Sequence, residues 1–146
     1  MTTPFNAHEF FVEAMPASFK DKSINIFSLT DEGPSDVSVV VARDRLREGE
    51  TLERYTQRQK GLMAQRMARF KLLGEGATQL DGQPAWWIDF EWVGPEGPML
   101  QRQFLTLSPM GVALLVTGTF RGTPKPEALE LFNQFLVGFH LRPAAG

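Results

Sequence analysis

The sequence contains no cysteine among its 146 residues. Disulfides, thiolate nucleophiles and zinc sites with cysteine ligands are therefore excluded. Histidine is also scarce, with only His8 and His140 at opposite ends of the chain. Neither histidine stands beside a marked nucleophile or beside carboxylates at metal-ligand spacing, so we expect no metal site and no cofactor.

The chain also lacks an excess of charge of one sign and a long apolar run. It carries 15 Lys and Arg against 17 Asp and Glu, so nothing draws the whole molecule toward nucleic acid or anionic lipid. The longest uncharged apolar stretch, Phe104 to Phe120, contains Pro109 and Gly111 and is too short to span a bilayer. The first nine residues have neither the basic nor the apolar region of a secretory signal, so we expect none here. We expect a soluble, cytoplasmic protein with no direct membrane insertion and no bound nucleic acid.

Hydrophobic residues, by contrast, are plentiful. They make up 42% of the chain, and 12 phenylalanines supply most of the aromatic side chains. A chain of this length buries about 70% of the surface that its unfolded form exposes, which is enough for a packed core. We therefore expect one domain over residues 1–146.

Alternation of apolar and polar residues, bounded by turn residues, predicts seven strands. Asp81-Gly82 between two of these segments is typical of a tight hairpin turn. The expected strands are Phe10–Glu13, Ile24–Leu29, Val37–Val41, Ala77–Leu80, Pro84–Val93, Met99–Leu107 and Val112–Phe120.

Spacing of three to four residues between apolar positions predicts two helices. The first is expected over Thr51–Leu73, with Gly74 as the left-handed residue that stops it. The second begins at Pro124 or Pro126, since proline is tolerated in a first helical turn. The apolar stripe of this second helix is Leu129, Phe132, Leu136 and Phe139.

The element order β-β-β-α-β-β-β-β-α predicts an α+β fold, in which two helices pack on a curved, largely antiparallel seven-stranded sheet. Two helices cover about one of the two faces of such a sheet. Several strands are nevertheless apolar on both sides. Either the uncovered face exposes an apolar patch, or the sheet curls on itself and buries it; the sequence leaves both open.

Two carboxylates are the main candidates for catalysis. Asp89 and Glu91 share one strand face with Trp87, about 7 Å apart along the backbone. A carboxylate pair can divide acid and base work, but a solvated strand face is the simpler interpretation. The alternate positions of this strand, Trp86, Ile88, Phe90 and Trp92, are expected in the core.

Glutamines occur where apolar residues are expected. Gln101 and Gln103 lie on one strand face, and Gln59 lies within the apolar stripe of the long helix, between Tyr55 and Leu62. One interpretation is polarity at the edge of the core. The other is an apolar groove with a few amide groups, able to hold an apolar helix and pair its polar groups.

Several local segments, taken together, resemble a known family. They are Phe5-Asn6, the strand Ile24-Asn-Ile-Phe27, the glutamine-rich helix Thr51–Leu73 and the turn Asp81-Gly82-Gln-Pro84-Ala85. Over essentially its full length the chain resembles the DcrB-related proteins of Mog1/PsbP-like fold. Within that group it is similar to the Eag chaperones of type VI secretion. The likeness rests on element order and local segments, not on a catalytic signature.

This resemblance implies a homodimeric cytoplasmic chaperone, not an enzyme. It would bind the hydrophobic, membrane-spanning N-terminal segments of a secreted toxin effector and help to load that effector onto the secretion spike protein. We expect an apolar groove lining at Ile24, Ile26, Val39 and Val41, and amide contacts at Gln59, Gln101 and Gln103. The alternatives are a regulatory binding module of the same fold with another partner, and a small-molecule enzyme that uses Asp89 and Glu91.

Overall fold

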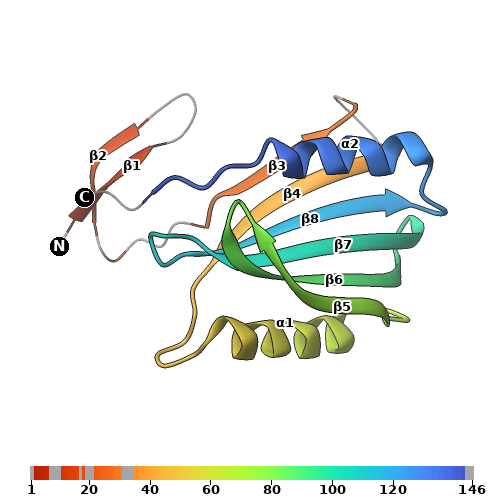
Figure 1. Ribbon diagram of the computed structural model, residues 1–146, viewed down its shortest axis with the longest axis horizontal. Coiled ribbons are helices and arrows are strands. Elements are labelled where there is room, and N and C mark those ends of the chain that lie inside the picture. The colour runs from red at the N-terminus through yellow and green to blue at the C-terminus, as the bar shows by residue number, and fades with distance from the viewer. Residues whose placement is uncertain (1, 7–10, 17, 19–21, 31–34, 144–146) are drawn as a thin grey trace.

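The structure is a computed structural model, in which residues 2–6, 11–16, 18, 22–30 and 35–143 are described. Four strands precede the first helix, and four more separate it from the second (Figure 1). The elements are β1 (Thr2–Asn6), β2 (Phe11–Pro16), β3 (Ile24–Ser28), β4 (Val37–Asp44), α1 (Leu52–Arg66), β5 (Lys71–Leu80), β6 (Gln83–Gly94), β7 (Gly97–Leu107), β8 (Ala113–Arg121) and α2 (Pro126–Val137).

The main sheet has six strands in the order β3-β4-β8-β7-β6-β5, and all its neighbouring strands are antiparallel. The predicted α+β class, with a largely antiparallel sheet and two helices, is confirmed. The prediction of one seven-stranded sheet is wrong, because β2 pairs with β1 in a separate two-stranded sheet. The segment Thr2–Asn6 has no alternating pattern that would mark it as a strand. Phe10, expected to begin the first strand, lies outside the described residues.

The two helices lie on opposite faces of the main sheet (Figure 1). Helix α2 packs over β4 and β8, and α1 packs under β6 and β7. The core on the α2 face includes Val37, Val39, Val41, Val116, Phe120 and Phe132. The core on the α1 face includes Tyr55, Ile88, Phe90, Leu105 and Ala113. As predicted, Ile88 and Phe90 are fully buried, and Trp86 and Trp92 pack against the same cluster.

A glycine in β8 lets α2 approach the sheet closely. A Cβ atom placed on Gly118 would lie 2.8 Å from the ring of Phe132, closer than real Cβ contacts. The Phe132 ring therefore rests directly on the strand and meets Phe120 edge-on, with ring centroids 5.9 Å apart. The absence of a side chain at Gly118 therefore sets how closely α2 approaches β8.

Helix α1 is shorter than predicted. Thr51 caps its N-terminus by accepting a hydrogen bond from the backbone N–H of Arg54 at 3.2 Å. It ends at Arg66, because Met67 is extended and Arg69 has a positive φ of 55°. The predicted helix end at Leu73 is therefore wrong, and Lys71–Leu80 is a strand.

Gly74 and Gly76 have a different role from the predicted helix stop. Both lie in β5, under the indole of Trp87 from β6. A Cβ atom on Gly74 would lie 3.1 Å from the indole, and one on Gly76 would lie 2.9 Å from its Nε1. The alternating glycines leave room for a large ring to lie flat on the strand.

The predicted hairpin turn at Asp81-Gly82 is confirmed. Leu80 pairs with Gln83 across the turn, and both turn residues have positive φ, 49° and 77°. Asp and Gly tolerate this conformation better than other residues do, which is why the dipeptide marks the turn in the sequence.

Candidate functional site

One half of the α1 face, below β3, β4 and β8, is covered by no helix in the described part of the chain. We call this surface the open face. Paired residues of antiparallel strands point to the same side, so the register identifies its members. They are Ile24, Ile26, Ser38, Val40, Ala42, Gln101, Gln103, Thr117 and Thr119. One row crosses four strands, from Ile26 through Val40 and Thr117 to Gln103.

The β3 side of the open face is apolar and exposed. Ile24 and Ile26 leave 59% and 69% of their surface accessible, although β-branched side chains of this kind are among the most often buried. Val40 and Ala42, their partners on β4, are half-buried. These side chains form an apolar strip that no helix of the described chain covers.

The β7 side of the open face carries ordered amide groups. The Trp92 indole N–H donates to Gln101 Oε1 at 2.6 Å, and Gln101 Nε2 donates to Thr119 Oγ1 at 2.8 Å. Gln103 Nε2 donates to Thr117 Oγ1 at 3.0 Å. These bonds between neighbouring strands hold both amides in fixed orientations.

The side-chain oxygen of Gln103 is an acceptor without a donor among the described residues. The Gln103 side chain is buried, with 8% of its surface accessible. A buried acceptor without a donor is uncommon and costly. The open face therefore combines exposed apolar surface with a buried acceptor, which a bound polar group can reach only if neighbouring side chains move.

Gln59 lies on α1 and contacts the end of β4. Its Nε2 lies 3.5 Å from Asp44 Oδ2, and the hydroxyl of Tyr55 donates to the same oxygen at 2.7 Å. Tyr55 is fully buried, and this burial, followed by the bond to Asp44, raises the pKa of its hydroxyl. The phenol therefore stays protonated and ties α1 to the end of β4.

The structure corrects the predicted position of two residues. Val39 and Val41 lie on the α2 face, with 7% and 6% of their surface accessible, in the same core as Phe132. Their side chains lie on the opposite side of the sheet from those of Ile24 and Ile26, because the register pairs these isoleucines with Ala42 and Val40. Valines occupy both sides of β4, so the sequence alone could not show which ones face the groove.

Sequence reasoning also missed Val40, Ala42, Thr117 and Thr119 as members of the open face. The threonines carry a readable signal, since Thr117 and Thr119 alternate on the Val112–Phe120 segment. That signal becomes useful only when the pairing of β8 with β7 is known. Ile24, Ile26, Gln101 and Gln103 lie on one side of the sheet, with β4 and β8 between the isoleucines and the glutamines. Their role as groove lining stays a prediction.

One of the two candidate carboxylates, Asp89, is held in an ion pair. Asp89 accepts two hydrogen bonds from the guanidinium of Arg102, at 2.8 and 2.9 Å, beside Trp87. This ion pair raises the pKa of Arg102. Asp89 and Trp87 are half-buried instead of fully solvated, whereas Glu91 is exposed. Arg102 thus engages both oxygens of Asp89.

Two kinds of feature are absent from the described residues. No group of three or more His, Asp or Glu side chains there is arranged to hold a metal ion. No helix in that part of the chain is long and apolar enough to cross a membrane.

Solved structures with a similar fold include proteins of several kinds. A Pseudomonas aeruginosa protein of unknown function superposes with a TM-score of 0.84 at 25% identity, covering 98% of this chain and 99% of its own. LpqN, involved in cell envelope biogenesis of Mycobacterium tuberculosis, has a TM-score of 0.61 at 14% identity and covers 86% and 88%. Cyanobacterial PsbP from Synechocystis has a TM-score of 0.57 at 13% identity and covers 96% and 92%. The last two likenesses show a shared fold and confirm the predicted PsbP-like architecture.

Sequence comparison gives the family. The chain is 31% identical over 127 residues to the Pseudomonas aeruginosa protein Effector EagT6, covering 86% of this chain and 88% of that protein. The sequence model of the DcrB family matches residues 14–137, which include the open face. Both findings confirm the resemblance drawn from the local segments, and the chain belongs to the DcrB family.

Proposed function

We propose that the protein is a cytoplasmic chaperone of a type VI secretion effector, and that it binds without catalysing a reaction. Its open face holds the hydrophobic N-terminal segments of that effector and so aids loading onto the secretion spike protein. Relation to Effector EagT6 supports a role directed at an effector. Membership of the DcrB family alone does not select this role, because one fold can serve many functions.

The observation that carries the proposal is the pair of exposed isoleucines on a part of the sheet that no helix of the described chain covers. A membrane-spanning helix has about 20 apolar residues, and each Å² left in water costs about 25 cal/mol. Ile24 and Ile26 offer apolar surface to cover such a helix. Gln103 Oε1 is buried, so it can accept from a Ser or Thr hydroxyl, or from an N–H group left unpaired at a helix start, only after neighbouring side chains move.

The dimensions of the open face suit one helix. Strands β3, β4 and β8 are neighbours, and strands repeat at about 4.8 Å, so the axes of the outer two are about 10 Å apart. An α-helix with side chains is about 10 Å wide. An apolar helix can therefore lie on these three strands, with its other side left for a second covering surface.

The homodimer belongs to the same proposal. Strand β3 pairs with β4 only, among the described residues, and all five of its residues are exposed. An edge strand with free backbone groups and apolar side chains is open to pairing with another chain. A second copy would supply further cover for the bound helix. Light scattering coupled to size-exclusion chromatography measures this directly, and we expect twice the mass of one chain.

Co-expression tests the proposal. A candidate effector's N-terminal hydrophobic segment is produced together with the tagged protein and recovered by affinity pull-down. We expect the segment to stay soluble and to co-purify with the wild type. Ile26→Asp, which places a charge on the open face, should abolish recovery. Val137→Asp is the matched control, since Val137 is 80% exposed but lies on α2.

Two results would contradict the proposal. One is aggregation of the segment with the wild-type protein. The other is equal recovery with Ile26→Asp and the wild type. Either result would favour a regulatory binding module with another partner.

A further inference from the structure

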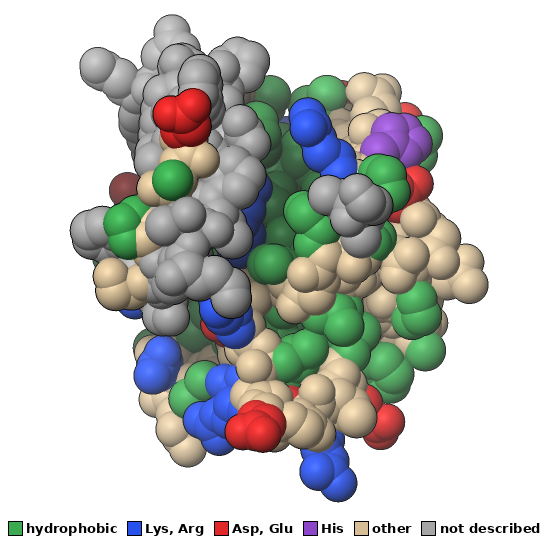
Figure 2. All heavy atoms as spheres, turned by 90° about the vertical axis from the view of Figure 1, so that its left-hand side faces the viewer, with side chains coloured by type: hydrophobic (Ala, Val, Ile, Leu, Met, Phe, Trp, Pro, Cys, Tyr) green, Lys and Arg blue, Asp and Glu red, His purple; other side chains and the backbone are tan. Residues whose placement is uncertain are grey.

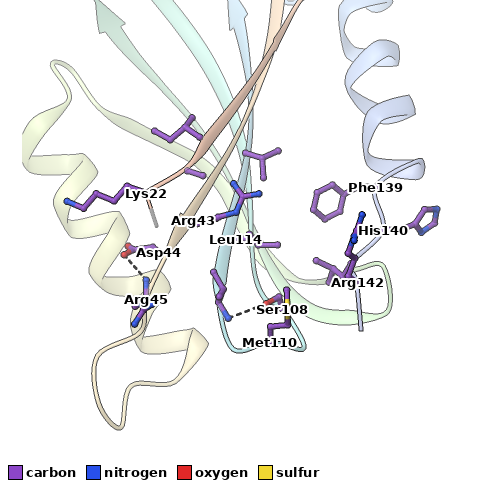
Figure 3. A pocket seen from close by; sticks show the side chains of 15 residues that line it. Lys22, Arg43, Asp44, Arg45, Ser108, Met110, Leu114, Phe139, His140 and Arg142 are labelled. Carbon is purple, nitrogen blue, oxygen red and sulfur yellow. Dashed lines mark hydrogen bonds between the residues drawn. The ribbon is translucent and has the colours of Figure 1, made fainter. Parts of the chain in front are cut away.

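Apart from the open face, the molecule has a cavity at the end of the sheet where β4 ends and β8 begins, beside the segment that follows α2 (Figures 2 and 3). We call it the cationic cavity. Its volume is about 820 Å³, within the range of pockets that hold small molecules or several side chains. Hydrophobic side chains, among them Val41, Val112, Leu114 and Phe139, line its apolar part. In Figure 3 the Phe139 ring points into the cavity, whereas the His140 ring points away from it.

Four cationic side chains surround this apolar lining: Lys22, Arg43, Arg45 and Arg142. In the described part of the chain none of them is paired with a carboxylate. Arg43 donates only to neutral oxygens, the Ser23 carbonyl at 3.1 Å and Asn25 Oδ1 at 3.0 Å. The positive charge of this cavity is therefore available to a ligand.

The cavity lining includes one acidic residue, Asp44. Tyr55 Oη and Gln59 Nε2 approach its Oδ2, and the backbone N–H of Arg45 donates to its Oδ1 at 2.8 Å. Asp44 thus serves the contact between α1 and β4. One negative charge against four positive ones leaves a strong preference for an anionic occupant.

The cations come from three separate segments; in Figure 3 Lys22 and Arg45 lie on one side of the cavity, Arg142 lies on the other, and Arg43 lies between them. Lys22 precedes β3, Arg43 and Arg45 lie at the end of β4, and Arg142 follows α2. One carboxylate head, as in a fatty acid, can contact one or two of them. A peptide segment with several carboxylates around an apolar side chain can contact more of them while it fills the apolar part.

The cavity adjoins the open face at the end of β4, because Ile24 and Ala42 of that face are also among its lining residues. We propose that it is a second binding site, for an acidic peptide segment with an apolar anchor, adjacent to the hydrophobic helix of the same effector. This assignment rests on the proposed function for the identity of the partner. The acidic and apolar chemistry of the occupant rests on the cavity itself.

Fluorescence anisotropy with two labelled decapeptides tests the site. One probe is Gly-Asp-Glu-Leu-Phe-Asp-Glu-Gly-Ser-Gly, and the other has Asn and Gln in place of its acids. We expect the acidic probe to bind at least ten-fold more tightly than the amide probe. The preference should shrink as salt is raised, because exposed charges are screened within about 10 Å at 0.1 M ionic strength.

Reversing the charge of cavity residues tests whether the acidic probe binds in the cavity. The double variant Arg45→Glu/Arg142→Glu should weaken the acidic probe at least ten-fold. Arg121→Glu reverses a single charge at the far end of β8 and should leave binding unchanged. Circular dichroism checks that each variant is folded. Equal binding of the two probes, or equal loss in the Arg121 variant, would overturn the proposal. So would displacement of the acidic probe by dodecanoate at lower concentration than by the unlabelled peptide, which would indicate a lipid anion.

The two proposals fail separately. Ile26→Asp should leave binding of the acidic decapeptide unchanged, because Ile26 does not line the cavity. If the decapeptide binds and no hydrophobic segment co-purifies, the cavity site stands and the chaperone proposal falls. If the segment co-purifies and the decapeptide does not bind, the cavity assignment falls alone.

Discussion

At the residue scale, single atoms decide how closely the layers of the molecule approach. Gly118 has no side chain where Phe132 rests on β8, and Gly76 has none where the Trp87 indole lies on β5. Gly61, within α1, has no atom within 4 Å of the place where a Cβ would stand. The same chemical change should therefore have opposite effects at different glycines.

Gly118→Ala should lower the free energy of unfolding by about 1–3 kcal/mol, because its methyl group would overlap the Phe132 ring. Gly61→Ala should raise it by about 0.5–1 kcal/mol through helix propensity. Urea denaturation followed by tryptophan fluorescence measures both. An unchanged midpoint for Gly118→Ala would show that α2 does not seat on β8 at this depth.

Gln103 allows binding to be separated from stability. Gln103→Met keeps the length of the side chain but removes the unpaired acceptor together with the bond to Thr117. Loss of one hydrogen bond and of one unsatisfied atom should nearly cancel, so stability should change by less than about 1 kcal/mol. Recovery of the hydrophobic segment should fall. Undiminished recovery with the folded variant would mean that Gln103 makes no contact with cargo.

At the element scale, the accuracy of sequence reasoning depended on whether a pattern was local. The Asp81-Gly82 turn is set by its own two residues and was predicted correctly. The end of α1 was not, because Met67 and Phe70 pack into the same cluster as Tyr55 and so continue the apolar spacing beyond Arg66. The prediction that Val39 and Val41 line the groove was wrong for a similar reason. The pairing of β3 with β4, which is not a local pattern, decides which side of β4 shares a face with Ile24 and Ile26.

The segment after α2 is tied to the β5–β6 turn by one carboxylate. Asp81 Oδ1 lies 3.0 Å from His140 Nδ1, and Oδ2 accepts from the backbone N–H of Leu141 at 2.6 Å. These bonds, the one to His140 foremost, lower the pKa of Asp81 below its ordinary 3.8. The tie also positions Arg142 and Phe139 at the cationic cavity.

The pH dependence of this tie has a definite sign. A carboxyl group with a lowered folded pKa contributes stability above its unfolded pKa and loses it as pH falls through the folded value. The stability difference between the wild type and Asp81→Asn should be full above pH 3.8 and should shrink below it. Urea denaturation at a series of pH values measures it. A difference that stays constant down to the folded pKa and beyond would contradict the contribution of the ionised Asp81.

At the scale of the whole molecule, the opposite placement of the two helices creates the binding surface. Helix α2 covers β4 and β8 from one side, while α1 covers β6 and β7 from the other. The β3–β4–β8 half of the α1 face is thus left open at an edge of the sheet, and its Ile24 end adjoins the cationic cavity. The sequence predicted the excess of apolar strand residues. It could not predict which half of which face they occupy, because that depends on strand order.

Site-specific photocrosslinking tests the central claim most directly. A benzophenone amino acid replaces Ile26 on the open face or, as the control, Val137 on α2, and each protein is co-expressed with the hydrophobic effector segment. We predict an ultraviolet-dependent crosslink at position 26, mapped by mass spectrometry to the apolar residues of the segment, and none at position 137. Co-purification of the segment with crosslinks at position 137 and none at position 26 would contradict the assignment of the open face.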